Sequence, residues 1–253
     1  MLNENLIWRI EDACLKAWPA LHEKIIDGWL LRFAHGLTRR SNSANPLRST
    51  LDATDALIAA CETEYRERGL PVYFRIPSIV SPAMPARLNQ LGYRSEGESL
   101  VLHADFAEAT AQEDAAVLMM SHPTEEWFST MARLQKHDQV KAGIYRRIVG
   151  SIKVRAAFAG LRHEGRMVAL AYGVLHDRLL CLESVITDEY FRGQGYAERT
   201  LRALFAHTRR SATGGPCLQV QADNISALAL YKNLGLREVY RYHYQKKEVT
   251  LNS

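Results

Sequence analysis

A glycine-rich turn that leads into an amphipathic helix constrains this sequence more than any other feature. Residues 192–195 read Arg-Gly-Gln-Gly, and apolar residues follow at the spacing of one helix face: Ala197, Leu201, Leu204 and Phe205. Glycines let successive amides point toward one ligand, and the first turn of a helix leaves its N–H groups unpaired. The turn is therefore predicted to hold an anion, and we expect a pyrophosphate.

Composition indicates a globular protein with a hydrophobic core. The chain has 253 residues, of which 47% are hydrophobic and 24% are charged, enough for one large domain or two of ordinary size. No apolar run approaches the ~20 residues that cross a bilayer, and the start of the sequence lacks the layout of a secretory signal. We therefore expect a cytoplasmic protein with no membrane partner.

Cysteines, histidines and charges argue against a metal, a disulfide and a nucleic-acid partner. The four cysteines lie far apart in apolar stretches, and the nine histidines lack the spacing of metal ligands. The formal net charge is only +4, and the basic residues form scattered pairs rather than one stripe. Solvated surface or an anionic cofactor accounts for this mildly positive balance.

The two halves of the chain end in the same order of elements. Before residue 104 a strand, a short helix and a strand are predicted, and the second half ends with a strand at 217–221, a helix at 224–234 and a strand at 238–246. The sequence Leu-Gly-Tyr-Arg at 91–94 matches Leu-Gly-Leu-Arg at 234–237. We therefore predict two domains, residues 1–104 and 115–253, joined by a polar linker at 105–114.

The second half combines this ending with three consecutive strands and the glycine-rich turn, and in that order it resembles the GNAT superfamily of acyl-CoA-dependent N-acetyltransferases. The resemblance covers residues 115–246. Two motifs carry it: Arg192-x-x-Gly195-x-Ala197 is similar to the family's pyrophosphate loop, and Asn224-x-x-Ala227-x-x-Leu230-Tyr231-x-x-x-Gly235 is similar to its second conserved helix. Glu189 stands where the family often has a proline.

The resemblance implies an α/β fold with an α+β mixed sheet. We expect two tandem GNAT-like domains, each a mostly antiparallel twisted sheet flanked by helices. The first half has lost the working parts, because there is no Arg-x-x-Gly-x-Gly/Ala turn between Leu31 and Leu70 and Leu88 stands at the position that aligns with Tyr231. We expect this half to shape the acceptor pocket or to stiffen the active half.

Acetyl-CoA as co-substrate, and the residues that bind it, are also implied by the resemblance. Its pantetheine arm would run beside the end of the strand at 179–187, and its pyrophosphate would lie on the glycine turn. The implied cofactor-binding residues are Val185, Ile186, Thr187, Arg192, Gly193, Gln194, Gly195, Tyr196, Ala197, Asn224, Ala227 and Tyr231.

Tyr231 and Glu183 are the candidate catalytic residues. By the same resemblance, Tyr231 donates a proton to the departing thiolate of CoA, which suits a phenol of pKa ~10 facing a thiol of ~8.5. Glu183 is the one acidic residue of the apolar strand 179–187, on the same face as Cys181 and Val185, and we expect it to take a proton from the attacking amine. Ordinary packing of Tyr231 and an ion-paired Glu183 are the alternatives.

The expected function is transfer of an acetyl group from acetyl-CoA to a primary amine by direct attack in a ternary complex. The alternative is a non-catalytic acyl-CoA-binding regulatory module, which the decay of the first half favours. An RNA-associated acetyltransferase is a third possibility and would bind nucleic acid with strong salt dependence. The sequence contains no motif for the acceptor or for the oligomeric state.

Overall fold

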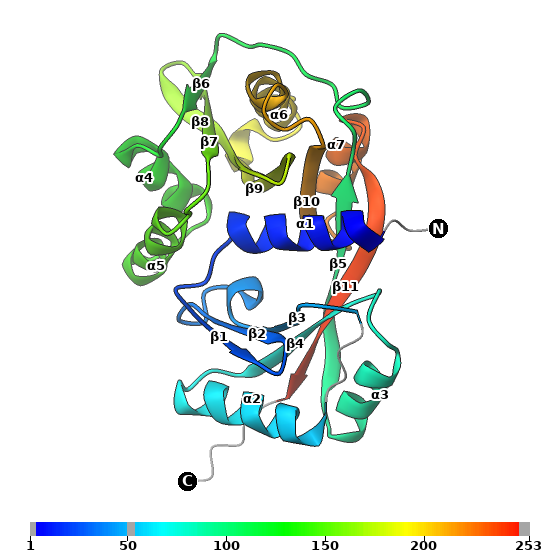
Figure 1. Ribbon diagram of the computed structural model, residues 1–253. Coiled ribbons are helices and arrows are strands. Elements are labelled where there is room, and N and C mark those ends of the chain that lie inside the picture. The colour runs from blue at the N-terminus through cyan, green and yellow to red at the C-terminus, as the bar shows by residue number, and fades with distance from the viewer. Residues whose placement is uncertain (1–3, 50–53, 248–253) are drawn as a thin grey trace. The chain divides into compact units, whose positions relative to one another are not determined.

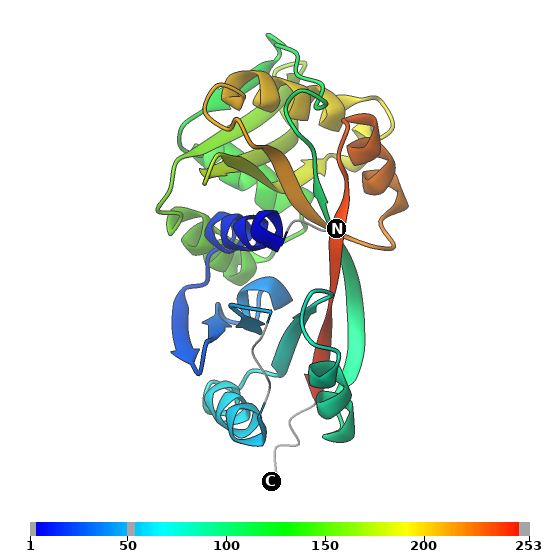
Figure 2. The same ribbon diagram turned by 45° about the vertical axis from the view of Figure 1, so that its right-hand side comes forward.

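A computed structural model describes residues 4–49 and 54–247, and these fold into two compact units (Figures 1 and 2). Unit 1 comprises Met1–Pro19 and Val101–Val239, and unit 2 comprises Ala20–Leu100 and Tyr240–Ser253. Strands β5 (Arg94–His103) and β11 (Arg237–Lys247) contribute residues to both units. The units therefore differ from the predicted boundaries at residues 104 and 115.

Helix α1 (Glu4–Ala17) explains part of this difference, because it packs within unit 1 although it begins the chain. Its buried face includes Ile7, Ile10 and Cys14. The Tyr172 hydroxyl donates a hydrogen bond of 2.8 Å to the carbonyl of Ala17 at the end of the helix. The partner of an amphipathic helix is set by packing, and here that partner lies more than a hundred residues away in sequence.

The sheet of unit 1 contains β6 (Val117–Met120), β7 (Ala156–His163), β8 (Arg166–His176), β9 (Leu179–Thr187) and β10 (Gly215–Gln221). The strand order is β11-β5-β10-β9-β8-β7-β6. Strands β6 to β9 pair antiparallel, whereas β10 runs parallel to β9. The predicted fold class, a mixed and mostly antiparallel sheet flanked by helices, is therefore confirmed.

Helices cover both faces of this sheet. On one face the Tyr172 ring of β8 contacts Trp127 of α4 (Glu125–Leu134), and α1 lies against β8 and β9. On the opposite face Gly173 lies beneath Leu204 of α6 (Tyr196–Thr208), which Figure 2 shows running across the strands. Helix α5 (Gln139–Gly150) follows α4, and α7 (Ile225–Asn233) lies between β10 and β11 in sequence.

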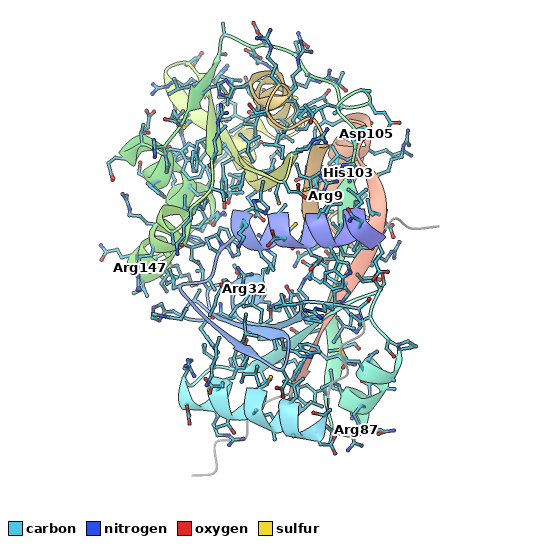
Figure 3. All side chains as sticks on the ribbon, in the orientation of Figure 1. Arg9, Arg32, Arg87, His103, Asp105 and Arg147 are labelled. Carbon is cyan, nitrogen blue, oxygen red and sulfur yellow. The ribbon has the colours of Figure 1, made fainter. Side chains whose placement is uncertain are left out.

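Unit 2 contains β1 (His22–Ile26), β2 (Trp29–Phe33), β3 (Ala44–Pro46), β4 (Val72–Pro77), α2 (Asp55–Glu67) and α3 (Ala83–Gln90). In its core, strand residues such as Leu31 and Phe74 pack with Leu57 of α2 and Leu88 of α3. Arg87 of α3 donates to Asp55 of α2 at 2.8 Å on the exposed side of these helices, where Figure 3 labels it.

Local features of the second half follow the sequence analysis closely. The predicted strand 179–187 is β9, and Thr124 and Asn224 cap α4 and α7 by accepting from Trp127 N and Ala227 N. Helix α5 and strand β1 are not among the predicted elements. Helix α5 lies in the connection before the three strands, and in the sequence only Asp138, which caps its first turn, marks its beginning.

Candidate functional site

The glycine turn predicted to hold an anion is an exposed loop that closes directly on α6. Gly193 and Gly195 adopt φ values of +74° and +77°, in the left-handed region that favours glycine. The first helical hydrogen bond runs from Arg199 N to Gly195 O at 3.0 Å, so the amides before residue 199 face the turn. A Cβ on either glycine would meet no atom within 4 Å, and the space beside the turn is therefore open.

Tyr196, a predicted cofactor residue, turns its side chain away from this open space. The ring is buried, and the hydroxyl lies 2.9 Å from His163 Nδ1. His163 and Tyr196 also contact Phe191, with ring centroids 5.1 and 5.7 Å from the Phe191 ring. Tyr196 therefore anchors the turn through its side chain, and what it offers a ligand is its backbone amide.

Strands β9 and β10 separate well before β9 reaches this turn. Their parallel pairing extends from Leu179 and Gly215 to Cys181 and Cys217, and within the described residues it goes no further. The following part of β9, residues 184–187, is half-exposed. The Thr187 hydroxyl is buried and has no hydrogen-bond partner among the described residues. The end of β9 therefore presents main-chain groups and a hydroxyl that a ligand can satisfy.

A bulge interrupts β9 just before this edge. Tyr172 of β8 pairs with Glu183, and Leu170 pairs with Ile186, so two residues of β9 stand opposite one residue of β8. Ser184 adopts a φ of +54°, and its hydroxyl accepts a hydrogen bond of 2.7 Å from the Tyr145 hydroxyl. The bulge breaks the alternation that the sequence analysis used to place Val185 on the face of Glu183.

Glu183 is buried, with 4% of its surface exposed. The thiols of Cys14 and Cys181 lie 3.5 Å apart in its neighbourhood. A hydrogen bond with Cys14, burial and the charge of Glu183 raise the pKa of Cys217 well above its ordinary value. The role of Glu183 as the base stays a prediction.

Asp188, which the sequence analysis missed, joins β9 to the turn. One carboxylate oxygen accepts from Arg133 Nη1 at 2.6 Å and from Arg166 Nη2 at 3.0 Å. The other accepts from Tyr190 N at 3.2 Å and so caps the short helix η2 (Glu189–Phe191). Burial opposes ionisation, but these hydrogen bonds prevail and hold the pKa of Asp188 below its ordinary value. The sequence signal for Asp188 is its place between the predicted strand 179–187 and the glycine turn.

Helix α7 carries the second predicted motif. The Asn224 side chain accepts from Ala227 N at 3.2 Å, which fixes the first turn of the helix. Ala227 is partly exposed and Tyr231 is 7% exposed. The Tyr231 carbonyl accepts from Leu236 N at 2.9 Å, where the chain leaves the helix. Asn224 therefore caps α7, and proton donation by Tyr231 stays a prediction.

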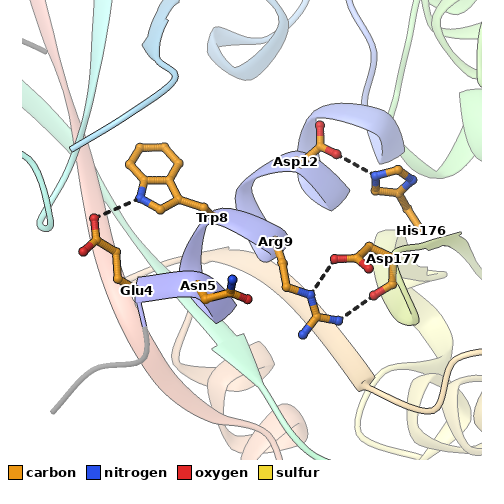
Figure 4. A pocket seen from close by; sticks show the side chains of 7 residues that line it. All are labelled: Glu4, Asn5, Trp8, Arg9, Asp12, His176 and Asp177. Atoms are coloured by element: carbon orange, nitrogen blue, oxygen red, sulfur yellow. Dashed lines mark hydrogen bonds and ion pairs between the residues drawn. The ribbon is translucent and has the colours of Figure 1, made fainter. Parts of the chain in front are cut away.

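An open surface pocket of about 860 Å³ lies at the other end of β9 (Figure 4). Its polar side chains bond to one another: His176 lies 2.6 Å from Asp12, and Arg9 donates to the Asp177 carboxylate at 2.5 Å. Because β9 has nine residues and each advances the chain ~3.3 Å, the pocket lies roughly 30 Å along the strand from the glycine turn. It is separate from the candidate site.

The described ranges, 4–49 and 54–247, offer neither a metal-binding cluster nor a membrane-spanning helix. They contain no group of three or more His, Cys, Asp and Glu residues arranged to hold a metal ion. None of the helices in these ranges has the length and apolar character needed to span a membrane.

Comparison with known proteins identifies the family. The model of a family described as "Probable histone acetyltransferase Rv0428c C-terminal" matches residues 5–245. The chain belongs to this GNAT acetyltransferase family. The chain is 24% identical over 245 residues to the uncharacterized N-acetyltransferase YobR of Bacillus subtilis, and the alignment covers 95% of this chain and 98% of that protein. It is 32% identical over 118 residues to the probable histone acetyltransferase Rv0428c of Mycobacterium tuberculosis, covering 47% of this chain and 36% of that protein.

Solved structures agree on the GNAT fold. A GCN5-related N-acetyltransferase from Kribbella flavida superposes with a TM-score of 0.72 at 11% identity, covering 96% of both chains. A tandem GNAT protein from the clavulanic acid biosynthesis pathway superposes with a TM-score of 0.66 at 13% identity, covering 89% of this chain and 79% of that one. The second likeness suggests a tandem arrangement of GNAT domains here as well.

Proposed function

We propose that this GNAT acetyltransferase moves an acetyl group from acetyl-CoA to a primary amine by direct attack in a ternary complex. One observation carries the proposal: an exposed glycine turn, where an added Cβ would meet no atom within 4 Å, directly follows a strand edge that β10 leaves unpaired. Together they offer donors for a diphosphate and a main-chain ladder for the amides of a pantetheine arm.

Residues of β9, the turn and α7 would hold the acyl donor, which supplies a thioester activated toward amines. Main-chain groups of residues 185–187 pair with the pantetheine amides, and the amides of residues 193–197 bind the pyrophosphate together with the Arg192 guanidinium. Asn224 fixes the start of α7, and the small Ala227 leaves room beside the ligand. Acetyl-CoA thereby fits the groups that this end of unit 1 presents.

Two buried residues carry out the two proton transfers of this reaction. A protonated amine cannot attack a thioester, so a base must remove a proton, and Glu183 is the candidate. The departing thiolate needs a proton in return, which the Tyr231 phenol donates. No covalent intermediate with the enzyme is required, because amine and thioester react directly.

Thiol release tests the reaction. The protein is incubated with acetyl-CoA and an amine panel that includes small amines, amino acids and, because the family description names histones, a lysine-containing peptide. We expect CoA thiol to appear with at least one acceptor. Tyr231→Phe should lose roughly 10²–10⁴ in turnover while binding acetyl-CoA normally. Tyr73→Phe is the matched control, since Tyr73 lies in unit 2 and should be dispensable.

The outcomes separate the alternatives. Binding of acetyl-CoA without thiol release from any acceptor would favour the non-catalytic acyl-CoA-binding module. Unchanged turnover in Tyr231→Phe would remove this residue from the mechanism. Calorimetry that detects no acetyl-CoA binding would overturn both functions.

A further inference from the structure

We infer that Asp188 is a positioning residue for acetyl-CoA: its carboxylate, held by Arg133 and Arg166, sets the shape of the turn that grips the diphosphate. The inference rests on the proposed function and adds a residue to it. Asp188 does not belong to the glycine motif and is 2% exposed, so we assign it no contact with the ligand.

The contacts of Asp188 use every polar atom of the residue. Its amide donates to Val168 O at 2.8 Å and so extends the pairing of β8 with β9 by one residue. Its carbonyl accepts from Phe191 N at 2.9 Å, and its side chain caps Tyr190 N. With the oxygen held by Arg133 and Arg166, the path of the chain from β9 into the turn is fixed at four atoms of one residue, four residues before Arg192.

The two arginines connect this point to other elements. Arg133 lies in the last turn of α4 and also donates to Met167 O of β8 at 3.3 Å, while Arg166 begins β8. Both guanidinium groups are about half-exposed, whereas the carboxylate between them is 3% exposed. Charge-assisted hydrogen bonds to a buried acceptor are the strong kind, so this arrangement holds the carboxylate in one place.

An effect of charge alone would change the affinity for acetyl-CoA in the opposite direction, and this makes the inference testable. A carboxylate close to a diphosphate site repels the ligand, so replacing Asp188 by neutral asparagine should strengthen binding if only the net charge mattered. The asparagine side chain would keep one oxygen for the Tyr190 amide, but its NH2 group would then face the two arginines and could accept from neither. If position matters, the same substitution weakens binding.

The experiment compares Asp188→Asn with wild type, using acetyl-CoA and acetyl-pantetheine, which lacks the diphosphate. We expect the KM and Kd for acetyl-CoA to rise about tenfold, the effect of one charge-assisted hydrogen bond, with kcat nearly unchanged. We expect the KM for acetyl-pantetheine to stay within about twofold of wild type, because the turn has nothing to grip. A purely structural role would affect both donors alike.

Three results would overturn the inference: tighter or equal binding of acetyl-CoA, an equal loss for both donors, or a loss confined to kcat. If Asp188→Asn does not fold, Arg166→Gln, which removes one half-exposed partner of the carboxylate, serves in its place with the same expected split between the donors. Arg162→Gln, on the same β7–β8 hairpin, is the control for loss of a positive charge. A wild-type protein that binds no acetyl-CoA would instead refute the proposed function.

Discussion

Replacing Gly215 by alanine should destabilise unit 1 strongly, and the structure provides the magnitude. Gly215 has a φ of +89°, and an added Cβ would lie 1.9 Å from the carbonyl oxygen of Ala104. The left-handed backbone costs an alanine about 1–2 kcal/mol. Moving two hydrogen-bonded strands apart to relieve the overlap costs ~1–3 kcal/mol more. The free energy of unfolding should therefore fall by roughly 2–5 kcal/mol.

Gly193→Ala is the matched control, because Gly193 has a similar φ of +74° but no atom within 4 Å of an added Cβ. Only the backbone cost of about 1–2 kcal/mol should remain. Thermal unfolding at equal protein concentration measures both variants. A difference of about 2 kcal/mol corresponds to roughly 4–8 °C in Tm for a chain of this size.

Acetyl-CoA binding should rank the two variants in the opposite order. Gly193 lies in the turn, so a Cβ there enters the space proposed for the diphosphate, whereas Gly215 lies at the start of β10. We expect Gly193→Ala to lose affinity for acetyl-CoA and folded Gly215→Ala to keep it. Gly215→Ala that is no less stable than Gly193→Ala would refute the close approach of Gly215 to Ala104.

Two further predictions concern titrating groups. All four cysteines are free and buried, and burial raises the pKa of Cys61 to about 12. A thiol reagent should therefore label none of them in the native protein and all of them in urea. Fast labelling of the native protein would contradict the packing of the cysteines. Burial lowers the pKa of His137 and of His243, so both stay neutral in the folded protein at a pH where the unfolded chain already binds protons. Their contribution to stability is present above about pH 6.5 and is lost as the pH falls below it. The urea midpoint should therefore drop between pH 7.5 and 5.5, and His137→Gln should reduce that drop.

Local chemistry made part of this structure predictable. The glycine turn and the caps Thr124 and Asn224 depend on residues within one turn of each other, and for such features the sequence contains the whole cause. The strand at 179–187 was equally clear, since an apolar run of this length between turn residues is typical of a buried strand.

Features that depend on distant partners were not predictable. The bulge at Ser184 forms where β8 and β9 are out of register and where Tyr145 donates from α5. Asp188 gains its importance from Arg133, 55 residues away. The membership of α1 in unit 1 depends on contacts such as that between Tyr172 and Ala17, 155 residues apart. In each case the sequence shows a suitable side chain but not the partner that gives it a role.

Asp188 also explains how the turn does without the proline common in the GNAT family, where this chain has Glu189. A proline would fix one φ angle, whereas here the carboxylate cap on η2 and the hydrogen bonds to Arg133 and Arg166 hold the same segment. Asp188 has a ψ of 133°, which a following proline accepts, and Glu189 begins η2, where a missing N–H costs little. Glu189→Pro should therefore be tolerated. It should be more stable than Glu189→Ala by about 0.4–1 kcal/mol, because both variants lose the exposed contact with Lys136 but only proline restricts the unfolded chain. Urea unfolding compares the two variants, and a proline variant less stable than the alanine variant would show that the backbone at Glu189 is held in a shape that proline cannot adopt.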